Sequence, residues 1–199
     1  MSIQTMRLLF ALLALAANAA FLILLVLGIG GRLSPAVASA RDTVLESLRG
    51  LELWSAFVVA LTATLGSLYL SEIADFVPCT LCWYQRIAMY PLVPLLGIAA
   101  WRKDHGIDRY AAVLAVAGAL IAAYHYLIQS FPSLDSGSCN PLVPCTAAYI
   151  RQFDFITIPY MALSAFLLIL TLLWADRRTN APNAPSSGTG TDSVASLPA

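Results

Sequence analysis

Long apolar runs dominate this chain of 199 residues and limit what it can fold into. Five runs are long enough, or nearly so, to cross a bilayer core, which requires about 20 helical residues. They cover approximately residues 8–28, 51–73, 81–101, 110–130 and 155–174. Inside lipid a spanning segment must satisfy its own backbone polar groups, and helices of this length do so. The sequence therefore predicts an all-α integral membrane protein.

The composition supports a location in the lipid bilayer. Hydrophobic residues make up 59% of the chain and charged residues only 11%, whereas soluble domains contain about 25% charged residues. The 11 basic and 11 acidic residues balance, and no Lys/Arg cluster is present. Nucleic-acid binding depends on such clusters, so the sequence argues against a nucleic-acid partner.

The distribution of basic residues predicts the topology. Eight of the 11 basic residues fall in connections that share one side if all five runs span: Arg32, Arg41, Arg49, Arg102, Lys103, Arg109, Arg177 and Arg178. The positive-inside rule assigns this side to the cytoplasm. Residues 74–80 and 131–154 then lie outside, and they carry Cys79, Cys139 and Cys145. Disulfides persist in an outer compartment and are rare in the cytosol.

Two polar segments complete the predicted organisation. Residues 31–50 form an inner-surface linker, in which Ser34-Pro35 is typical of a helix start and apolar residues recur at helical spacing. Residues 177–199 are rich in Pro, Ser, Gly, Thr and Ala and predict a disordered cytoplasmic tail.

The first run has a second interpretation as a secretory signal, cleaved after Ala38-Ser39-Ala40. Its apolar part is about 20 residues long, however, and signal sequences have about 7–15. Cleavage would also leave Arg41 and Arg49 outside, against the orientation of the other runs. We therefore expect a transmembrane helix here.

The third run begins with a redox-type motif. Residues 87–101 alone are too short to cross, so the helix must begin near Leu81 and include Cys82 and Arg86. The C-x-x-C of Cys79 and Cys82 then lies at a helix start, where unpaired N–H groups and the helix dipole stabilise a thiolate. Two alternatives remain open for the cysteines: a zinc site that also uses Cys139 and Cys145, and structural disulfides.

Three polar residues lie near the C-x-x-C at one predicted depth. Arg86 follows Cys82 by four residues, and His125 and Gln129 share one face near the outer end of the fourth run. Both Arg86 and His125 should lie about 7 Å below the outer surface. Ionisable residues in membrane helices indicate function, although Arg86 could also snorkel to the headgroups. Together the three predict a site that holds a quinone by its carbonyls.

The second cysteine pair lies in the loop between the last two runs. Cys139 and Cys145 enclose two prolines, and Ser, Asp and Gly precede them, which predicts a mobile, solvent-facing segment. A disulfide closing so short a loop adds modest stability. Accessibility to the thiols of another protein favours a shuttle pair.

A known family shares these motifs. They comprise Pro78-Cys79-Thr80-Leu81-Cys82-Trp83-Tyr84-Gln85-Arg86 with Met89-Tyr90-Pro91-Leu92, then His125-Tyr126-Leu127-Ile128-Gln129, the loop cysteines, and Phe155-Ile156-Thr157-Ile158-Pro159. From about residue 60 to residue 174 the chain resembles the DsbB/BdbC disulfide-bond formation proteins of bacteria. The family fold implies a four-helix transmembrane core over residues 51–176, and residues 1–30 are then an extra N-terminal transmembrane helix.

The resemblance implies an enzyme of the cytoplasmic membrane that oxidises a DsbA-like thioredoxin-fold partner and reduces ubiquinone or menaquinone. Cys139 would be attacked by the partner, Cys145 would resolve the mixed disulfide, and Cys79 would exchange with Cys145. Cys82 would be the thiolate next to the quinone, surrounded by Arg86, His125 and Gln129. No resident metal is expected.

Two departures and two alternatives accompany this interpretation. The Cys139–Cys145 spacing is closer to the BdbC type than to the enterobacterial type, and the extra helix has no assigned role. A vitamin K epoxide reductase-like protein would carry its loop cysteines before the C-x-x-C, whereas here the C-x-x-C comes first. A non-enzymatic membrane protein with two structural disulfides is the other alternative.

Overall fold

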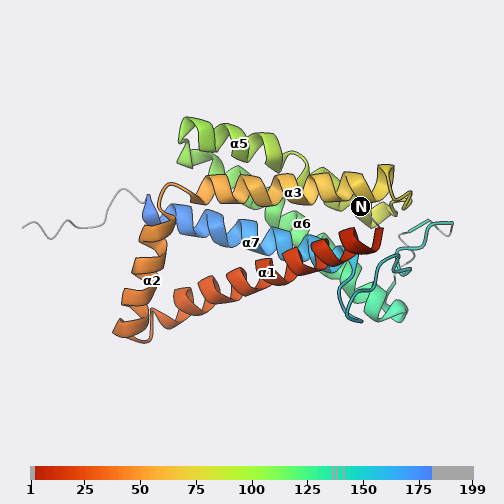
Figure 1. The fold of residues 1–199 in the computed structure, drawn as a ribbon, viewed down its shortest axis with the longest axis horizontal. Coiled ribbons are helices and arrows are strands. Elements are labelled where there is room, and N and C mark those ends of the chain that lie inside the picture. Colours follow the sequence, from red (N-terminus) through yellow and green to blue (C-terminus); the bar gives the residue numbers. More distant parts are fainter. Residues whose placement is uncertain (1–2, 136, 138, 141, 181–199) are drawn as a thin grey trace, which may run out of the picture.

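The computed structural model describes residues 3–135, 137, 139–140 and 142–180. These residues form helices and loops with one isolated bridge, Gln152–Ile156, and no strand. The elements are α1 (Ile3–Gly30), α2 (Pro35–Leu48), α3 (Glu52–Glu72), α4 (Thr80–Met89), α5 (Leu92–Arg102), η1 (His105–Ile107), α6 (Asp108–Ser130), η2 (Pro132–Leu134) and α7 (Ile158–Thr179). Figure 1 shows them as an elongated bundle. The predicted all-α membrane fold is confirmed.

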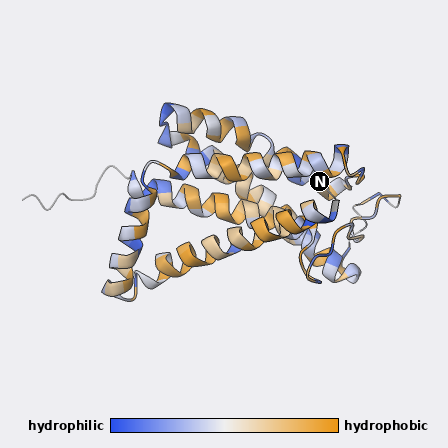
Figure 2. Ribbon diagram, in the orientation of Figure 1, coloured by the Kyte–Doolittle hydropathy of each residue, from blue (hydrophilic) through white to orange (hydrophobic). Residues whose placement is uncertain are grey.

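Four of the described helices are long and apolar enough to cross a membrane, and they involve α1, α3, α6 and α7. Large apolar side chains are exposed along them, Val26 and Val113 among them. Figure 2 shows this apolar character around most of α1, in contrast to the hydrophilic residues of α2. Surfaces of this kind are stable only in lipid, so the chain is a multi-pass membrane protein.

The third predicted span is not one continuous helix: it consists of the shorter helices α4 and α5, and neither is among the four candidate spans of the described residues. Pro91 and Pro94 lack the N–H groups that would continue the helical hydrogen bonds. Val93 N donates instead to Tyr90 O at 3.2 Å, the tighter spacing of a 3₁₀ turn. The break redirects the chain: α4 packs mainly against α6, and α5 packs mainly against α3. The change of partner helix was not predicted from the sequence.

Helix α1 is inclined to the bundle (Figure 1). Its 28 residues extend for about 42 Å, longer than the hydrocarbon core of about 30 Å, so it must tilt in a membrane. The linker helix predicted after Ser34 is α2, with Pro35 in its first turn. It connects the diverging end of α1 to α3 (Figure 1).

Close packing between α6 and α7 forms the centre of the bundle. Ala111, Ala115 and Ala122 of α6 are fully buried, and small side chains let membrane helices approach closely. A Cβ atom on Gly118 would lie 2.2 Å from the ring of Phe166, so only glycine fits. This rigid contact positions the next turns of α6, which carry His125 and Gln129.

Polar contacts join the helices at the end of the bundle that contains α2. His105 Nδ1 lies 2.9 Å from Asp176, Arg177 pairs with Asp108, and Thr179 donates to Glu52 at 2.7 Å. With these contacts α7 extends to Thr179, whereas the tail was predicted to begin at residue 177. The remainder of the predicted tail, residues 181–199, lies outside the described residues.

Candidate functional site

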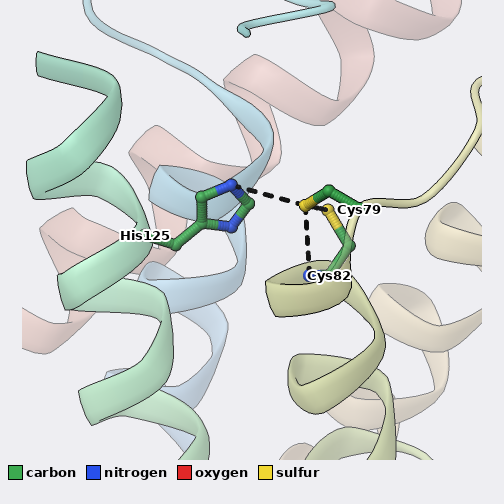
Figure 3. A group of neighbouring side chains, drawn as sticks. All are labelled: Cys79, Cys82 and His125. Carbon is green, nitrogen blue, oxygen red and sulfur yellow. Dashed lines mark hydrogen bonds between the residues drawn. The ribbon is translucent and has the colours of Figure 1, made fainter. Parts of the chain in front are cut away.

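The C-x-x-C motif forms the N-terminus of α4, as predicted. Cys79 is the N-cap residue, with extended φ and ψ angles of −72° and 172°, and its Sγ accepts from the backbone N–H of Cys82 at 3.4 Å. Both cysteines are free thiols, and their Sγ atoms lie 2.8 Å apart (Figure 3). The motif is therefore present in its reduced form, with one sulfur held at a helix start.

The environment of Cys79, which precedes the spanning helix, favours a thiolate. The hydrogen bond with the Cys82 thiol is the main cause and lowers the pKa of Cys79 to about 4, against the opposing effect of burial. His125 and the Cys82 N–H lower this pKa further. A thiolate is the nucleophile in disulfide exchange. The sequence had assigned the thiolate role to Cys82.

His125 connects the two cysteine pairs. Its Nε2 lies 3.7 Å from Cys79 Sγ (Figure 3) and 3.1 Å from the backbone oxygen of Cys145, and its Nδ1 lies 2.9 Å from Gln85 Nε2. The Cys145 oxygen can only accept and the Gln85 amide nitrogen can only donate, so one neutral tautomer, protonated at Nε2, satisfies both. This tautomer also directs its N–H towards the sulfur of Cys79.

Cys139 and Cys145 form a disulfide with a Cα–Cα distance of 5.9 Å. Cys145 is fully buried, in one apolar cluster with Cys79, Leu81 and Ile128. Cys139 is half-buried. The prediction of a solvent-facing pair is therefore wrong for Cys145, because apolar neighbours and the hydrogen bond from His125 hold it inside. Residues 136, 138 and 141 of the loop lie outside the described residues.

Arg86 points away from His125. Its guanidinium donates to Ser67 of α3 through Nε and Nη2, both at 2.9 Å, and lies over the Trp83 ring at 5.2 Å. Only 9% of Arg86 is exposed. The snorkelling alternative is therefore wrong, since the side chain crosses to α3 instead of reaching outward.

The predicted polar set is divided between two cavities. A cavity of about 420 Å³ is lined by Cys82, Gln85 and Arg86, and His125 and Gln129 do not line it. A much smaller cavity is lined by Cys79, Cys82, His125 and Gln129. The expectation that Arg86 and His125 surround one ligand is thus not met, because α4 lies between α3 and α6 and presents different faces to each. Cys82 lines both cavities.

The large cavity, here called the large groove, is mainly apolar. Its walls come from α1, α3, α4 and α7, with Phe76, Val77, Pro78 and Tyr149 near the cysteines. Its lining also contains Cys82, Gln85, Arg86 and Ser67, and Arg86 donates to Ser67 at 2.9 Å. A polar end and a long apolar channel suit a ring with carbonyl oxygens and an attached hydrocarbon chain.

Gln85 and Ser67 were missed by the sequence reasoning. Gln85 is 6% exposed and binds His125, and Ser67 holds Arg86. A polar residue three positions after Cys82 in an apolar helix was the available signal for Gln85. Gln129, which was predicted, donates to Ala147 O at 3.3 Å, and its Oε1 is buried without a partner among the described residues.

Cys79, Cys82 and His125 also meet the geometric requirement for a metal site, with one donor atom from each lying within 4.8 Å of the others. The four-cysteine zinc site that the sequence left open does not form, because Cys139 and Cys145 are bonded to each other. A thiophilic ion at the three remaining donors stays chemically reasonable.

Comparison with known proteins agrees with these features. The family model "Disulfide bond formation protein DsbB" matches residues 51–175. Disulfide bond formation protein C of Bacillus subtilis (strain 168) is 51% identical over 122 residues, covering 61% of this chain and 88% of that protein. A probable disulfide formation protein C 1 of Bacillus cereus (strain ATCC 10987 / NRS 248) is 50% identical over 125 residues, covering 62% and 90%.

No solved structure matched the chain significantly. The family match begins at residue 51, so α1 and α2 lie outside it. The matched part contains both cysteine pairs, Arg86, His125 and Gln129. The predicted resemblance is confirmed, and the chain belongs to the DsbB family of disulfide bond formation proteins.

Proposed function

We propose that this protein is a membrane dithiol:quinone oxidoreductase that re-oxidises a DsbA-like thioredoxin-fold partner. In the balanced reaction one partner dithiol and one quinone give one partner disulfide and one quinol. Two electrons and two protons pass from thiols to quinone. The acceptor is ubiquinone or menaquinone, and the reaction sustains disulfide formation in exported proteins.

The main support for the proposal is that the two cysteine pairs meet in a single buried cluster, while one cysteine of each pair lies at a different, more accessible place. Cys145 and Cys79 are both buried in the cluster, whereas Cys139 is half-buried and Cys82 lines the large groove. A disulfide with a purely structural role does not require a second cysteine pair next to it. A relay needs this arrangement, since a protein must reach one end and a lipid-soluble oxidant the other.

The relay proceeds by thiol–disulfide exchange. A partner thiolate attacks Cys139 and releases Cys145, and the second partner thiol then releases Cys139 and leaves as a disulfide. The Cys145 thiolate attacks Cys79 of an oxidised C-x-x-C and frees Cys82. Cys139 next attacks Cys145, which restores the loop disulfide and leaves Cys79 and Cys82 reduced. The structure has this last combination of one disulfide and two thiols.

Residues of the groove complete the cycle. The quinone, when bound, supplies the oxidising power that returns Cys79 and Cys82 to a disulfide. Arg86 offers a buried cation beside Cys82, and Ser67 holds it in place. Because the guanidinium is charged, it stabilises negative charge on a neighbouring sulfur or oxygen in this low-dielectric region. His125 orients Cys79 and the backbone of Cys145 for exchange.

We also propose that the cysteine pairs face the outside of the bacterial cytoplasmic membrane. Basic residues are concentrated in the connections of the opposite end, where α2 and the start of α6 lie. A disulfide relay requires an oxidising compartment.

The function is tested by mixing purified protein with a reduced thioredoxin-fold dithiol oxidase and a quinone. Quinol and partner disulfide should form in equal amounts over many turnovers. If all four cysteines stay in one redox state and no quinol appears, the enzymatic proposal fails.

A second candidate, metal binding, follows from the grouping of Cys79, Cys82 and His125. It predicts that protein purified without chelator contains stoichiometric zinc. It also predicts that this protein does not oxidise the partner dithiol, whether or not quinone is added. Metal-free protein with full turnover would eliminate it.

A further inference from the structure

The extra helix α1 forms part of the large groove. Phe10, Leu13, Ala14, Ala16 and Ala17 line the groove opposite α3 and α7. The family match covers the other helical walls but not α1. Without α1, this side of the groove would open directly into the lipid.

The side chains of α1 differ between its two faces. Three of the five residues that line the groove are alanines, whereas Leu12, Leu22 and Ile23 on the exposed face are large. Small side chains leave the groove open while α1 remains in contact with the bundle. Leucine at the alanine positions would extend into this space.

Specific contacts hold the N-terminal half of α1 against the bundle. The Phe10 ring packs closely against Gly66 of α3. A Cβ atom on Gly66 would lie only 3.1 Å from this ring, so glycine permits the close approach. Asn18 donates to the hydroxyl of Tyr160 at 2.9 Å. A polar contact of this kind in an apolar helix fixes its rotation, and thereby the face that meets the groove.

The same half of α1 also reaches the segment before the C-x-x-C. The Arg7 guanidinium lies over the Phe76 ring at 5.4 Å, and Phe76 stacks on Tyr149 at 5.4 Å. Phe76 and Tyr149 line the groove next to Cys82. Helix α1 therefore contacts both the apolar channel and its polar end.

We propose that α1 is the wall of the groove that binds the polyprenyl tail of the membrane quinone. Between Ser71 and Val58 the groove follows α3 for about 20 Å, which accommodates a hydrocarbon chain and exceeds the size of a quinone ring. The polar end beside Cys82 distinguishes this occupant from a lipid acyl chain, which has no carbonyl-bearing ring to place there. The inference rests on the proposed function and adds a residue set that determines specificity for the tail.

The direct test is photo-crosslinking with a quinone that carries a photoreactive group on its tail. Mass spectrometry should find adducts on residues 10–17 of α1, and unlabelled long-tailed quinone should suppress them. Adducts confined to α3 and α7 would overturn the inference. Adducts on α1 that long-tailed quinone does not suppress would assign this wall to membrane lipid, and would also overturn it.

A matched pair of variants provides the kinetic test. Ala14→Trp fills the groove from a buried position, whereas Leu12→Trp adds the same bulk on the lipid face. For Ala14→Trp the KM for long-tailed quinone should rise about tenfold or more, since displacing two buried methylene groups has this effect. The KM for a tail-less quinone should not change, and Leu12→Trp should alter neither.

The tail-less quinone separates the possible failures. Wild-type protein that reduces neither quinone would refute the proposed function and this inference together. If wild-type protein reduces both quinones, the ratio of the KM for long-tailed quinone to the KM for tail-less quinone is compared in the two variants. Equal ratios in Ala14→Trp and Leu12→Trp would refute the role of α1 alone. Should Ala14→Trp not fold, the milder Ala17→Leu provides the comparison, with a smaller rise in KM expected and an unchanged KM contradicting the inference.

Discussion

The Nε2 atom of His125 lies 3.7 Å from the Sγ atom of Cys79. The same nitrogen lies 3.1 Å from the backbone oxygen of Cys145, so one imidazole contacts both cysteine pairs. A protonated Nε2 donates towards a sulfur that carries negative charge and towards a carbonyl that anchors the loop. His125 therefore holds Cys79 and the backbone of Cys145 next to each other, as the proposed exchange requires.

The acidity of Cys79 can be measured in protein that carries Cys139→Ser and Cys145→Ser and has been reduced. Because the pKa of Cys79 is lowered to about 4, its thiolate should persist as the pH falls from neutral and should be lost as the pH passes through about 4. The ultraviolet absorbance of the thiolate reports this transition. A transition near the ordinary value of about 8.5 would contradict the assignment.

Two further substitutions in that background should shift the pKa of Cys79 by different amounts. The Cys82 thiol is the largest cause of the low pKa of Cys79, and His125 is a smaller one. Cys82→Ala, which removes this donor, should therefore move the transition of Cys79 upward further than His125→Ala does. The reverse order would show that the imidazole, not the neighbouring thiol, controls Cys79.

Single cysteine substitutions should separate the two half-reactions. Cys82→Ser should abolish quinone reduction, because Cys82 is the cysteine that lines the large groove and Cys79 then has no partner within the motif. Cys139→Ser should abolish oxidation of the partner and leave quinone binding intact, measured by co-purified quinone. Native-rate partner oxidation by Cys139→Ser would show that the loop pair is not the entry point.

Arg86→Ala should raise the apparent KM for quinone by about tenfold or more, since a hydrogen bond to a charged group contributes about 1.5–3 kcal/mol. Ser67→Ala should give a smaller rise, because it frees Arg86 without removing the charge. Steady-state kinetics with varied quinone measures both. An unchanged KM in Arg86→Ala would limit this residue to its contacts with Ser67 and Trp83.

Gly118→Ala should destabilise the bundle by about 1–3 kcal/mol, because overpacking forces neighbouring side chains out of place. The added methyl group would lie 2.2 Å from the Phe166 ring. Gly97→Ala is the matched control, since its methyl group would lie 3.1 Å from Phe57. Thermal unfolding in detergent should show the larger loss for Gly118→Ala, and equal losses would contradict the packing described.

The sequence was sufficient for four of the five predicted spans and for the helix start at Cys79, because these depend on local properties. Apolar length determines a span, and the helix start follows from the length that a span requires. The burial of Cys145 was not accessible in the same way. It depends on Ile128 and His125 of a different helix, which the local Pro and Ser content does not reveal.

The arrangement of side chains around Cys82 could not be predicted from the sequence either. Counting residues predicts a depth for Arg86 and His125 but does not predict the rotation of their helices. Rotation depends on packing: α4 lies between α3 and α6, so Arg86 reaches Ser67 while Gln85 reaches His125. The contribution of α1 to the groove likewise depends on tertiary contacts such as Asn18 with Tyr160.

In the proposed relay, electrons pass between the two cysteine pairs through Cys145 and Cys79. The most direct measurement uses protein with Cys82→Ser and Cys139→Ser, which retains only these two cysteines. Because both are buried in one apolar cluster, mild oxidation should join them in an intramolecular disulfide, seen as a cross-linked peptide by mass spectrometry. Two free thiols after oxidation, or disulfides only between molecules, would contradict the relay.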